Sequence, residues 1–415
     1  MSLPKREWLF LLIIALISVG LSFLDLAHIP QAPSGVHCRG LIVAVDNSQV
    51  RVNLIVKTEE QVLTVQLLNG PHKDQKMSVT NMLTGKMEFD EFYQTGEELL
   101  VEYGVDKDGK PQNGLARGHY RLRLQIVLIA LFGGLLLLVA GVTGVKAMFS
   151  FIFVAMVLWK LYFPLLLLGY PPLLTGLTVV ALLTAVITFT VGGVNHRGLA
   201  TFAGSMMGIL LTCALAVWFT GLFRLHGAIR PFAETLLYSG HYDLNLTNIF
   251  IASVFIGSSG AVMDLAMDIA ASMDELQRKH PDIGLLEHIC SGLRVGRAVT
   301  GTMTTTLLLA YSSSHIAMFL LFIAKGLPAV NILNAPFVAA EVLNILVGSF
   351  GLVTVAPFTA LVAGFLYRFG NHQGINNAHP RYVGNQLRQK MFPLPVALWR
   401  AKLGTISGLV RVVKK

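Results

Sequence analysis

The sequence predicts an α-helical polytopic membrane protein with a small all-β domain inserted after its first helix. Of the 415 residues, 54% are hydrophobic and only 13% are charged, and the mean hydropathy is +0.63. Soluble domains average about 25% charged residues, so this composition excludes an ordinary soluble enzyme. Long apolar stretches recur along the chain, and a segment of about ninety residues between the first two shows the pattern of short strands instead.

Eight apolar stretches are long enough to cross a membrane, because a bilayer core of about 30 Å requires about 20 mostly apolar helical residues. They are roughly 7–25, 122–142, 144–168, 172–192, 198–222, 247–273, 297–325 and 335–368. The prolines and glycines from Pro164 to Pro172 predict a kink followed by a tight reversal. The expected domains are an N-terminal anchor helix (1–30), a β domain (31–120), a seven-helix transmembrane domain (121–370) and a basic tail (371–415).

Basic residues near the ends of these stretches predict the orientation. Lys5 and Arg6 precede the first stretch, and no clear cleavage site follows before Asp25, so an uncleaved anchor is favoured over a cleaved signal peptide. With eight crossings, the Lys and Arg residues of the short loops fall on the same side as both termini, which the positive-inside rule makes cytoplasmic. The β domain is then extracytoplasmic.

The sequence of the segment 31–120 predicts β-strands. "RGLIVAVDNSQVRVNLIVKTEEQVLTVQLL" and "GEELLVEYGVDKDGKP" alternate or cluster Val, Leu and Ile in short runs separated by turn residues. About five short strands in this length predict a small closed, OB-like barrel, since closure removes exposed strand edges. Its acidic and basic residues nearly balance and its aromatic residues form no stacking row, so no nucleic-acid partner is expected.

The C-terminal tail has eight Lys or Arg residues and no acidic residue after Gly370. Apolar residues recur in it at helical spacing between Val396 and Val413, with basic residues off that face. This pattern predicts an amphipathic helix that binds the anionic lipids of the inner leaflet, with partner binding as the less favoured alternative.

Asp264 and Asp268 are the most informative polar residues of the apolar stretches. They share a helix face because positions i and i+4 do. Counting from Asp274 at the cytoplasmic end puts Asp268 about 9 Å and Asp264 about 15 Å deep, near the bilayer centre. An ionised carboxylate there costs on the order of 3 kcal/mol, so it must meet a partner, water or a cation, or be protonated. The alternative is that Asp268 reaches headgroup water and Asp264 is a neutral, hydrogen-bonded packing residue.

The next apolar stretch carries hydroxyl groups at a similar depth, at Thr302, Thr304 and Thr305. Such hydroxyls can coordinate a cation, relay protons or bond to the aspartates, and Arg297 is a candidate charge partner or gate. For any single threonine, the ordinary alternative is a hydrogen bond to a carbonyl of its own helix.

A second polar level is predicted near the outer end of the same stretch. His315 falls there, and Glu341 and Asn344 lie a few residues inside the outer end of the last stretch. A Glu–His pair at an outer mouth, with the aspartates and threonines further in, would mark a polar route across the bilayer. The alternative is that Glu341 faces lipid headgroups.

Motifs of soluble enzymes are absent: the chain has no Walker loop, no dinucleotide glycine fingerprint, no His-Glu-x-x-His and no Cys-x-x-Cys. We therefore expect no enzyme but an ion-coupled transporter or ion-permeation protein of unknown substrate. The alternative is a non-transporting assembly or scaffold protein that acts through its outer β domain. No cofactor is expected unless a cation binds, with Asp264 and Asp268 as candidate metal ligands. The expected partners are the lipid bilayer and either a second copy or another membrane protein.

The strings "GSSGAVMDLAMDIAASMDEL" and "VGRAVTGTMTTTLLLAYSSS", together with the anchor helix and outer β domain, resemble the YibE/YibF family of bacterial membrane proteins. The resemblance spans roughly residues 35–368. Its most specific positions are Gly260, Met263, Asp264, Asp274, Glu275, Gly296, Arg297, Gly301, Thr302, Met303 and Thr304. It implies a bacterial plasma-membrane location and the topology above, and it implies no activity. Thr305 and "SSSHIAM" depart from the family pattern, so the resemblance gives His315 no role.

Overall fold

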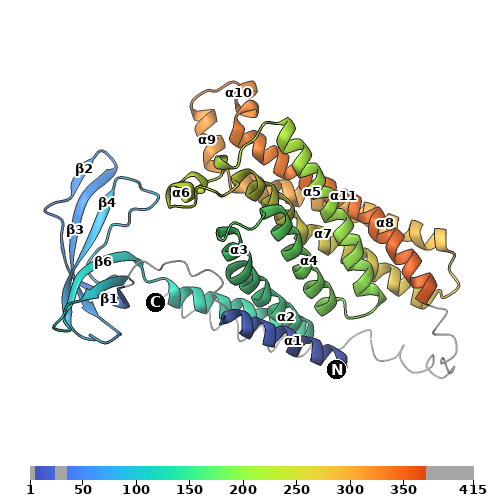
Figure 1. Ribbon diagram of the computed structural model, residues 1–415, viewed down its shortest axis with the longest axis horizontal. Coiled ribbons are helices and arrows are strands. Elements are labelled where there is room, and N and C mark those ends of the chain that lie inside the picture. Colours follow the sequence, from blue (N-terminus) through green and yellow to red (C-terminus); the bar gives the residue numbers. More distant parts are fainter. Residues whose placement is uncertain (1–4, 24–34, 371–415) are drawn as a thin grey trace, which may run out of the picture.

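The computed structural model describes residues 5–23 and 35–370, which form a β-barrel and a helical domain (Figure 1). The predicted tail helix, at 371–415, lies outside the described residues. The helices are α1 (Lys5–Ser22), α2 (Leu122–Val157), the π-helix η1 (Leu158–Tyr162), α3 (Phe163–Leu167), α4 (Pro172–Val191), α5 (His196–Leu222), the 3₁₀ helix η2 (Gly227–Ile229), α6 (Ala233–Tyr238), α7 (Leu246–Lys279), α8 (Leu285–Ser313), α9 (Ile316–Ala324), α10 (Ala329–Asn334) and α11 (Pro336–Gly370). The strands are β1 (Val36–Asp46), β2 (Arg51–Asn53), β3 (Val56–Leu67), β4 (Lys76–Thr84), β5 (Glu98–Val105) and β6 (Pro111–His119).

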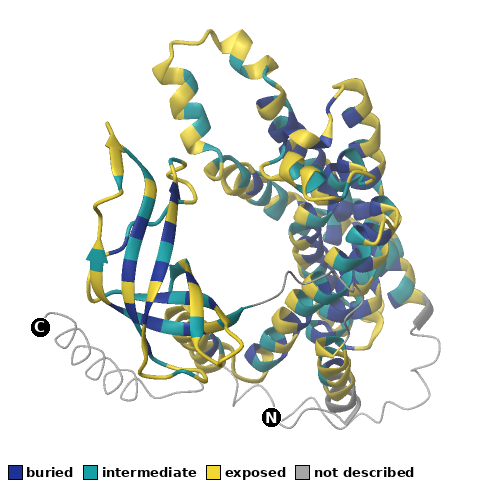
Figure 2. Cartoon of the chain, turned by 60° about the vertical axis from the view of Figure 1, so that its left-hand side comes forward, coloured by how far each residue is buried: buried dark blue, intermediate teal, exposed yellow. Residues whose placement is uncertain are grey.

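Five strands close into a barrel in the order β1-β3-β4-β6-β5-β1. The short β2 pairs only with the first residues of β3 and lies outside this closed order. The β4–β6 pair is parallel and the other pairs are antiparallel. Alternate residues of β3, namely Leu63, Val65 and Leu67, are fully buried, which is the pattern of a strand with one face on a core (Figure 2). The small closed barrel predicted from the sequence is therefore present.

A polar junction joins the barrel to the helical domain. The carboxylate of Glu91 accepts hydrogen bonds from Nη2 of Arg121 at 2.6 Å and from the backbone N–H of His119 at 2.7 Å. Arg121 immediately precedes α2. Partial burial alone would raise the pKa of Glu91, but these hydrogen bonds outweigh it and hold the pKa below the usual value. The junction therefore anchors the end of β6 and the start of α2 to the same carboxylate.

The chain reverses direction inside α2, at Gly141. This residue has φ 55° and ψ −125°, a backbone conformation that glycine tolerates and other residues rarely adopt. The rings of Phe132 and Phe151 lie 6.3 Å apart, whereas a straight helix would separate these residues by about 28 Å. Two antiparallel arms thus occupy 122–167, as the two predicted stretches 122–142 and 144–168 require, and the next reversal follows at Leu168–Pro171.

Helix α7 forms the centre of the helical domain and packs against α4, α5, α8 and α11. Small residues allow α5 and α11 to approach closely. A Cβ atom at Gly204 of α5 would lie 2.8 Å from Cα of Thr359 in α11, and Gly351 of α11 lies directly against Thr212 of α5. Any larger side chain at Gly204 would force the two helices apart.

Five helical segments of the described part are long and apolar enough to cross a membrane, or six if α8 and α9 form one broken span. These long apolar helices are those of a membrane protein. The predicted stretch 297–325 is not one straight helix, because the chain bends by 67° between α8 and α9, and α8 begins earlier than predicted, at Leu285. At the bend, Nδ1 of His315 hydrogen-bonds to the carbonyl of Tyr311. In a continuous helix this carbonyl would instead accept from the backbone N–H of His315, so the side chain competes with the helical hydrogen bond.

Candidate functional site: a polar pocket and the exposed face of helix α7

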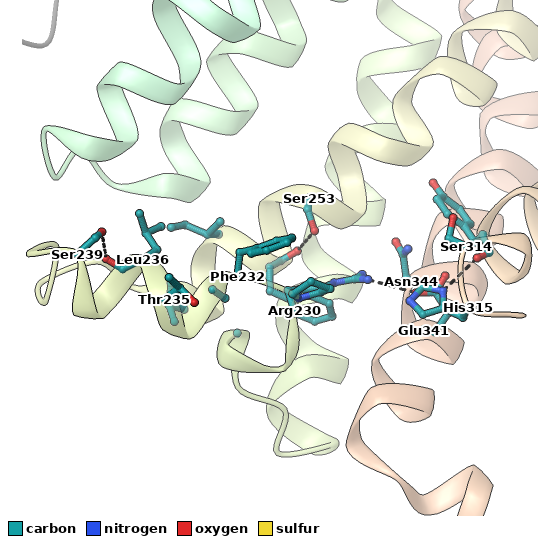
Figure 3. Close-up of a pocket in the computed structure, with 17 residues that line it drawn as sticks. Arg230, Phe232, Thr235, Leu236, Ser239, Ser253, Ser314, His315, Glu341 and Asn344 are labelled. Carbon is teal, nitrogen blue, oxygen red and sulfur yellow. Dashed lines mark hydrogen bonds and ion pairs between the residues drawn. The ribbon is translucent and has the colours of Figure 1, made fainter. Parts of the chain in front are cut away.

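A cavity of about 830 Å³ lies where η2 and α6 meet the start of α7, the end of α8 and the start of α11 (Figure 3). Its walls are largely apolar, and they include Phe232, Leu236, Ile249 and Phe250. The charged side chains lie at one end of the cavity with several polar ones: Arg230, Tyr311, Ser314, His315, Glu341 and Asn344. Three more hydroxyl-bearing residues, Ser253, Thr235 and Ser239, line the cavity elsewhere. Small-molecule sites typically have this combination of volume, apolar walls and few convergent polar groups.

The carboxylate of Glu341 is the centre of the polar end. Its side chain is only 4% exposed. Oε2 accepts a hydrogen bond from Nη1 of Arg230 at 3.3 Å and lies 3.8 Å from Nε2 of His315. The other oxygen, Oε1, is buried and has no hydrogen-bond partner among the described residues. A buried carboxylate oxygen without a partner is costly, so this atom is available to a ligand or a proton.

The structure thus pairs Glu341 with His315 at the level that the sequence predicted. Because a carbonyl can only accept, the contact with Tyr311 places the proton of His315 on Nδ1, and Nε2 faces Glu341. A second proton on His315 would complete an ion pair. The hydroxyl of Tyr311 is also buried without a partner in the described structure, and the buried Asn344 follows Glu341 by one helical turn.

Arg230 was not predicted from the sequence. It follows η2 in the connection between α5 and α7, and its guanidinium lies 5.1 Å from the centre of the Phe250 ring. The sequence of a connection without helical or strand periodicity does not predict where its side chains lie. The one indication in the sequence was a basic residue between two apolar stretches. Arg230 supplies the charge that balances Glu341.

The barrel reaches the lip of this cavity. The ring of Phe89, in the β4–β5 connection, makes an edge contact with Phe232 at 5.8 Å between centroids. In Figure 1 this connection extends from the barrel towards α6. Phe232 lines the cavity and has a left-handed backbone (φ 62°), which is uncommon for a bulky residue. A barrel residue is therefore positioned to affect access to the cavity.

Asp264 and Asp268 lie on the exposed face of α7, outside the helical core. Neither side chain makes a hydrogen bond or an ion pair with another described residue. Exposed positions with small or polar side chains recur along this face from the cavity to the opposite end of the helix. We call this set the α7 stripe: Ser253, Gly257, Gly260, Asp264, Asp268 and Ser272.

The threonines lie level with the aspartates, but their hydroxyls form no hydrogen bond with them in the described structure. Three close contacts set the register of the antiparallel helices α7 and α8: Gly257 with Tyr311, Ile269 with Gly296, and Met273 with Gly292. Counted from these contacts, Asp264 is level with residues 301–304. The hydroxyls of Thr302, Thr304 and Thr305 all bond to carbonyls of their own helix. The exposed Arg297 makes no ion pair in the described structure.

The described residues contain no group of three or more His, Cys, Asp or Glu side chains able to hold a metal ion. A cation bound by Asp264 and Asp268 would therefore need hydroxyl, carbonyl or water oxygens to complete its coordination, which hard cations accept.

Comparison with known families gives two matches. Residues 128–369 match the YibE/F-like protein family, and residues 42–115 match the YibE/F family N-terminal domain. The first match covers the helical domain from α2 to α11, and the second covers most of the barrel. Neither the comparison with curated proteins nor that with solved structures gave a match. The two domain matches together show that the chain belongs to the YibE/F family.

Proposed function

We propose that this chain moves an ion or small solute across the membrane, with the Glu341 cavity and the α7 stripe as successive parts of one route. The α7 stripe is the observation that carries the proposal. Its exposed face holds two carboxylates in the middle of a long apolar helix, where lipid contact would be costly. An aqueous route along that face would hydrate them.

The cavity and the stripe are continuous along the helix. Ser253 belongs to both, and Asp264 follows it by about 17 Å along the helix axis. A solute that leaves the polar end of the cavity therefore meets small residues at Gly257 and Gly260 before it reaches the first carboxylate. In this proposal Asp264 is the coupling carboxylate, Asp268 and the level threonines supply further oxygen ligands, and Arg297 acts as a gate.

The proposed setting is the bacterial plasma membrane, with eight crossings, cytoplasmic termini and an extracytoplasmic barrel. The two arms of α2 on either side of Gly141, the bent α8–α9 pair and α1 would bring the number of crossings to eight. The C-terminal tail would lie on the anionic inner leaflet.

The second candidate is an assembly or scaffold protein, in which another membrane helix, from a second copy or a partner, covers the α7 stripe. The exposed carboxylates of Asp264 and Asp268 support this candidate too, because polar groups of a partner helix could hydrogen-bond to them in place of water. Hydrogen bonds between the aspartates and threonines of this chain would favour a purely structural role, and the described residues contain none.

Flux into proteoliposomes tests the two candidates. The purified protein is reconstituted with pH-sensitive and divalent-cation-sensitive dyes inside, and the wild type is compared with Asp264→Asn and with Asp282→Asn, a matched change in an exposed loop. Transport predicts flux in the wild type and the loop variant and none in the correctly folded Asp264→Asn. Equal flux in all three would contradict the role of Asp264, and no flux in any would favour the assembly protein.

A further inference from the structure

We infer that the Glu341 cavity binds a small zwitterion with an apolar body, such as an apolar amino acid or a short apolar peptide. The inference rests on the proposed function, since it names the class of solute that would enter the route. It is drawn from the balance of charge at the polar end and from the apolar walls beside it.

The polar end is close to neutral, because Arg230 and Glu341 compensate each other. A lone cation bound there would be repelled by the guanidinium, and a lone anion by the carboxylate. A molecule that carries both charges meets neither penalty, provided that its ammonium faces Glu341 and its carboxylate faces Arg230.

Both protein charges retain bonding capacity for such a molecule. Oε1 of Glu341 has no partner among the described residues and can accept from an ammonium group. Of the five N–H groups of the Arg230 guanidinium, only Nη1 donates to a described residue, and the side chain is 29% exposed. The partnerless hydroxyl of Tyr311 adds one more donor at the same end. Charge-assisted bonds of this kind are the strong ones.

The rest of the cavity suits the apolar body. Phe232, Leu236, Ile249 and Phe250 form its walls, and the volume of about 830 Å³ exceeds that of a single amino acid. The geometry thus places an amphiphile with its charged end at Glu341 and its apolar body against Phe232 and Leu236 (Figure 3).

Equilibrium binding to the purified full-length chain in lipid nanodiscs tests the inference, with radiolabelled phenylalanine and phenylalanyl-leucine as probes. At least one probe is expected to bind. Its N-acetylated form, which lacks the ammonium, and its C-terminal amide, which lacks the carboxylate, are each expected to bind at least tenfold more weakly. Glu341→Gln should abolish the preference for the free ammonium, and Arg230→Gln the preference for the free carboxylate.

Three results would overturn the inference: neither probe binds, the blocked derivatives bind as well as the zwitterions, or binding is unchanged in the correctly folded Glu341→Gln. The controls are Glu287→Gln and Arg224→Gln, which lie outside the cavity. Failure of the inference is distinguishable from failure of the proposed function. Ion flux that depends on Asp264, without zwitterion binding, would support the transport route and exclude the zwitterion as its solute. Zwitterion binding without ion flux, and without uptake of the bound radiolabelled probe into the proteoliposomes, would support the binding site and contradict the transport route.

Discussion

Neutralising Glu341 should destabilise the protein through its partner Arg230. In Glu341→Gln the shape of the side chain is kept, but the carboxylate that accepts from Nη1 of Arg230 at 3.3 Å becomes a neutral amide. The guanidinium then remains over the Phe250 ring without a counter-charge.

The size of the effect follows from the exposure of the two partners. Removing one partner of a fully buried pair costs about 3–5 kcal/mol. Glu341 is 4% exposed but Arg230 is 29% exposed, so the stranded guanidinium keeps some hydration from the cavity. We therefore expect a loss of about 1.5–3 kcal/mol, the range for a hydrogen bond to a charged group.

A double-mutant cycle separates this coupling from other effects. The free energy of unfolding is measured in mixed micelles by titration with a denaturing detergent, for the wild type, Glu341→Gln, Arg230→Gln and the double variant. The double variant should be more stable than the sum of the two losses predicts, by at least about 1 kcal/mol. Additivity within about 0.5 kcal/mol would refute the coupling.

Three further outcomes follow from the structure. Gly204→Ala should lower the free energy of unfolding in detergent by about 1–3 kcal/mol, because the new methyl group meets the backbone of α11. The control Gly260→Ala, where a Cβ meets nothing within 4 Å, should be neutral or stabilising. Equal melting temperatures of the two variants would contradict the close packing of α5 and α11. Since the folded-state pKa of Glu91 is lowered, its stabilising effect is complete above its unfolded-state pKa of about 4.3 and is lost as the pH falls through the folded-state value. Glu91→Gln should therefore increase the rate of amide hydrogen exchange at the barrel junction at neutral pH. After correction for intrinsic exchange rates, the increase in exchange that the wild type shows on acidification should be smaller in the variant. The same pH profile in both proteins would contradict this. Cysteines at Phe89 and Phe232 should cross-link in native membranes once the native cysteines are replaced, and no cross-link would mean that the barrel does not dock there.

The sequence predicted the barrel and the positions of most helices because both depend on local periodicity. Alternation within β3 and the long apolar stretches of α5, α7 and α11 are visible in the chain without tertiary information. The bend between α8 and α9 was missed, since an apolar run through His315 looks continuous. The bend is explained by a contact that the sequence does not show, the hydrogen bond between the His315 ring and the carbonyl of Tyr311.

The candidate site was predictable only in part. Counting along helices placed Glu341 level with His315, and Asp264 level with the threonines, because helical rise converts residue number into depth. Counting cannot show which way a side chain points, and the threonine hydroxyls bond to their own helix instead. Arg230 comes from an aperiodic connection, and its pairing with a residue 111 positions away depends entirely on the tertiary fold.

The central claim is that water reaches the α7 stripe, and cysteine accessibility in intact membranes tests it most directly. In a chain without native cysteines, Gly257→Cys and Gly260→Cys are exposed to a membrane-impermeant, water-soluble thiol reagent, with Leu309→Cys on the exposed apolar face of α8 as the matched control. An aqueous route predicts that both stripe positions are labelled and the control is not. Stripe positions as unreactive as Leu309→Cys would mean that lipid or another protein covers this face of α7, and the account of a transport route would be wrong.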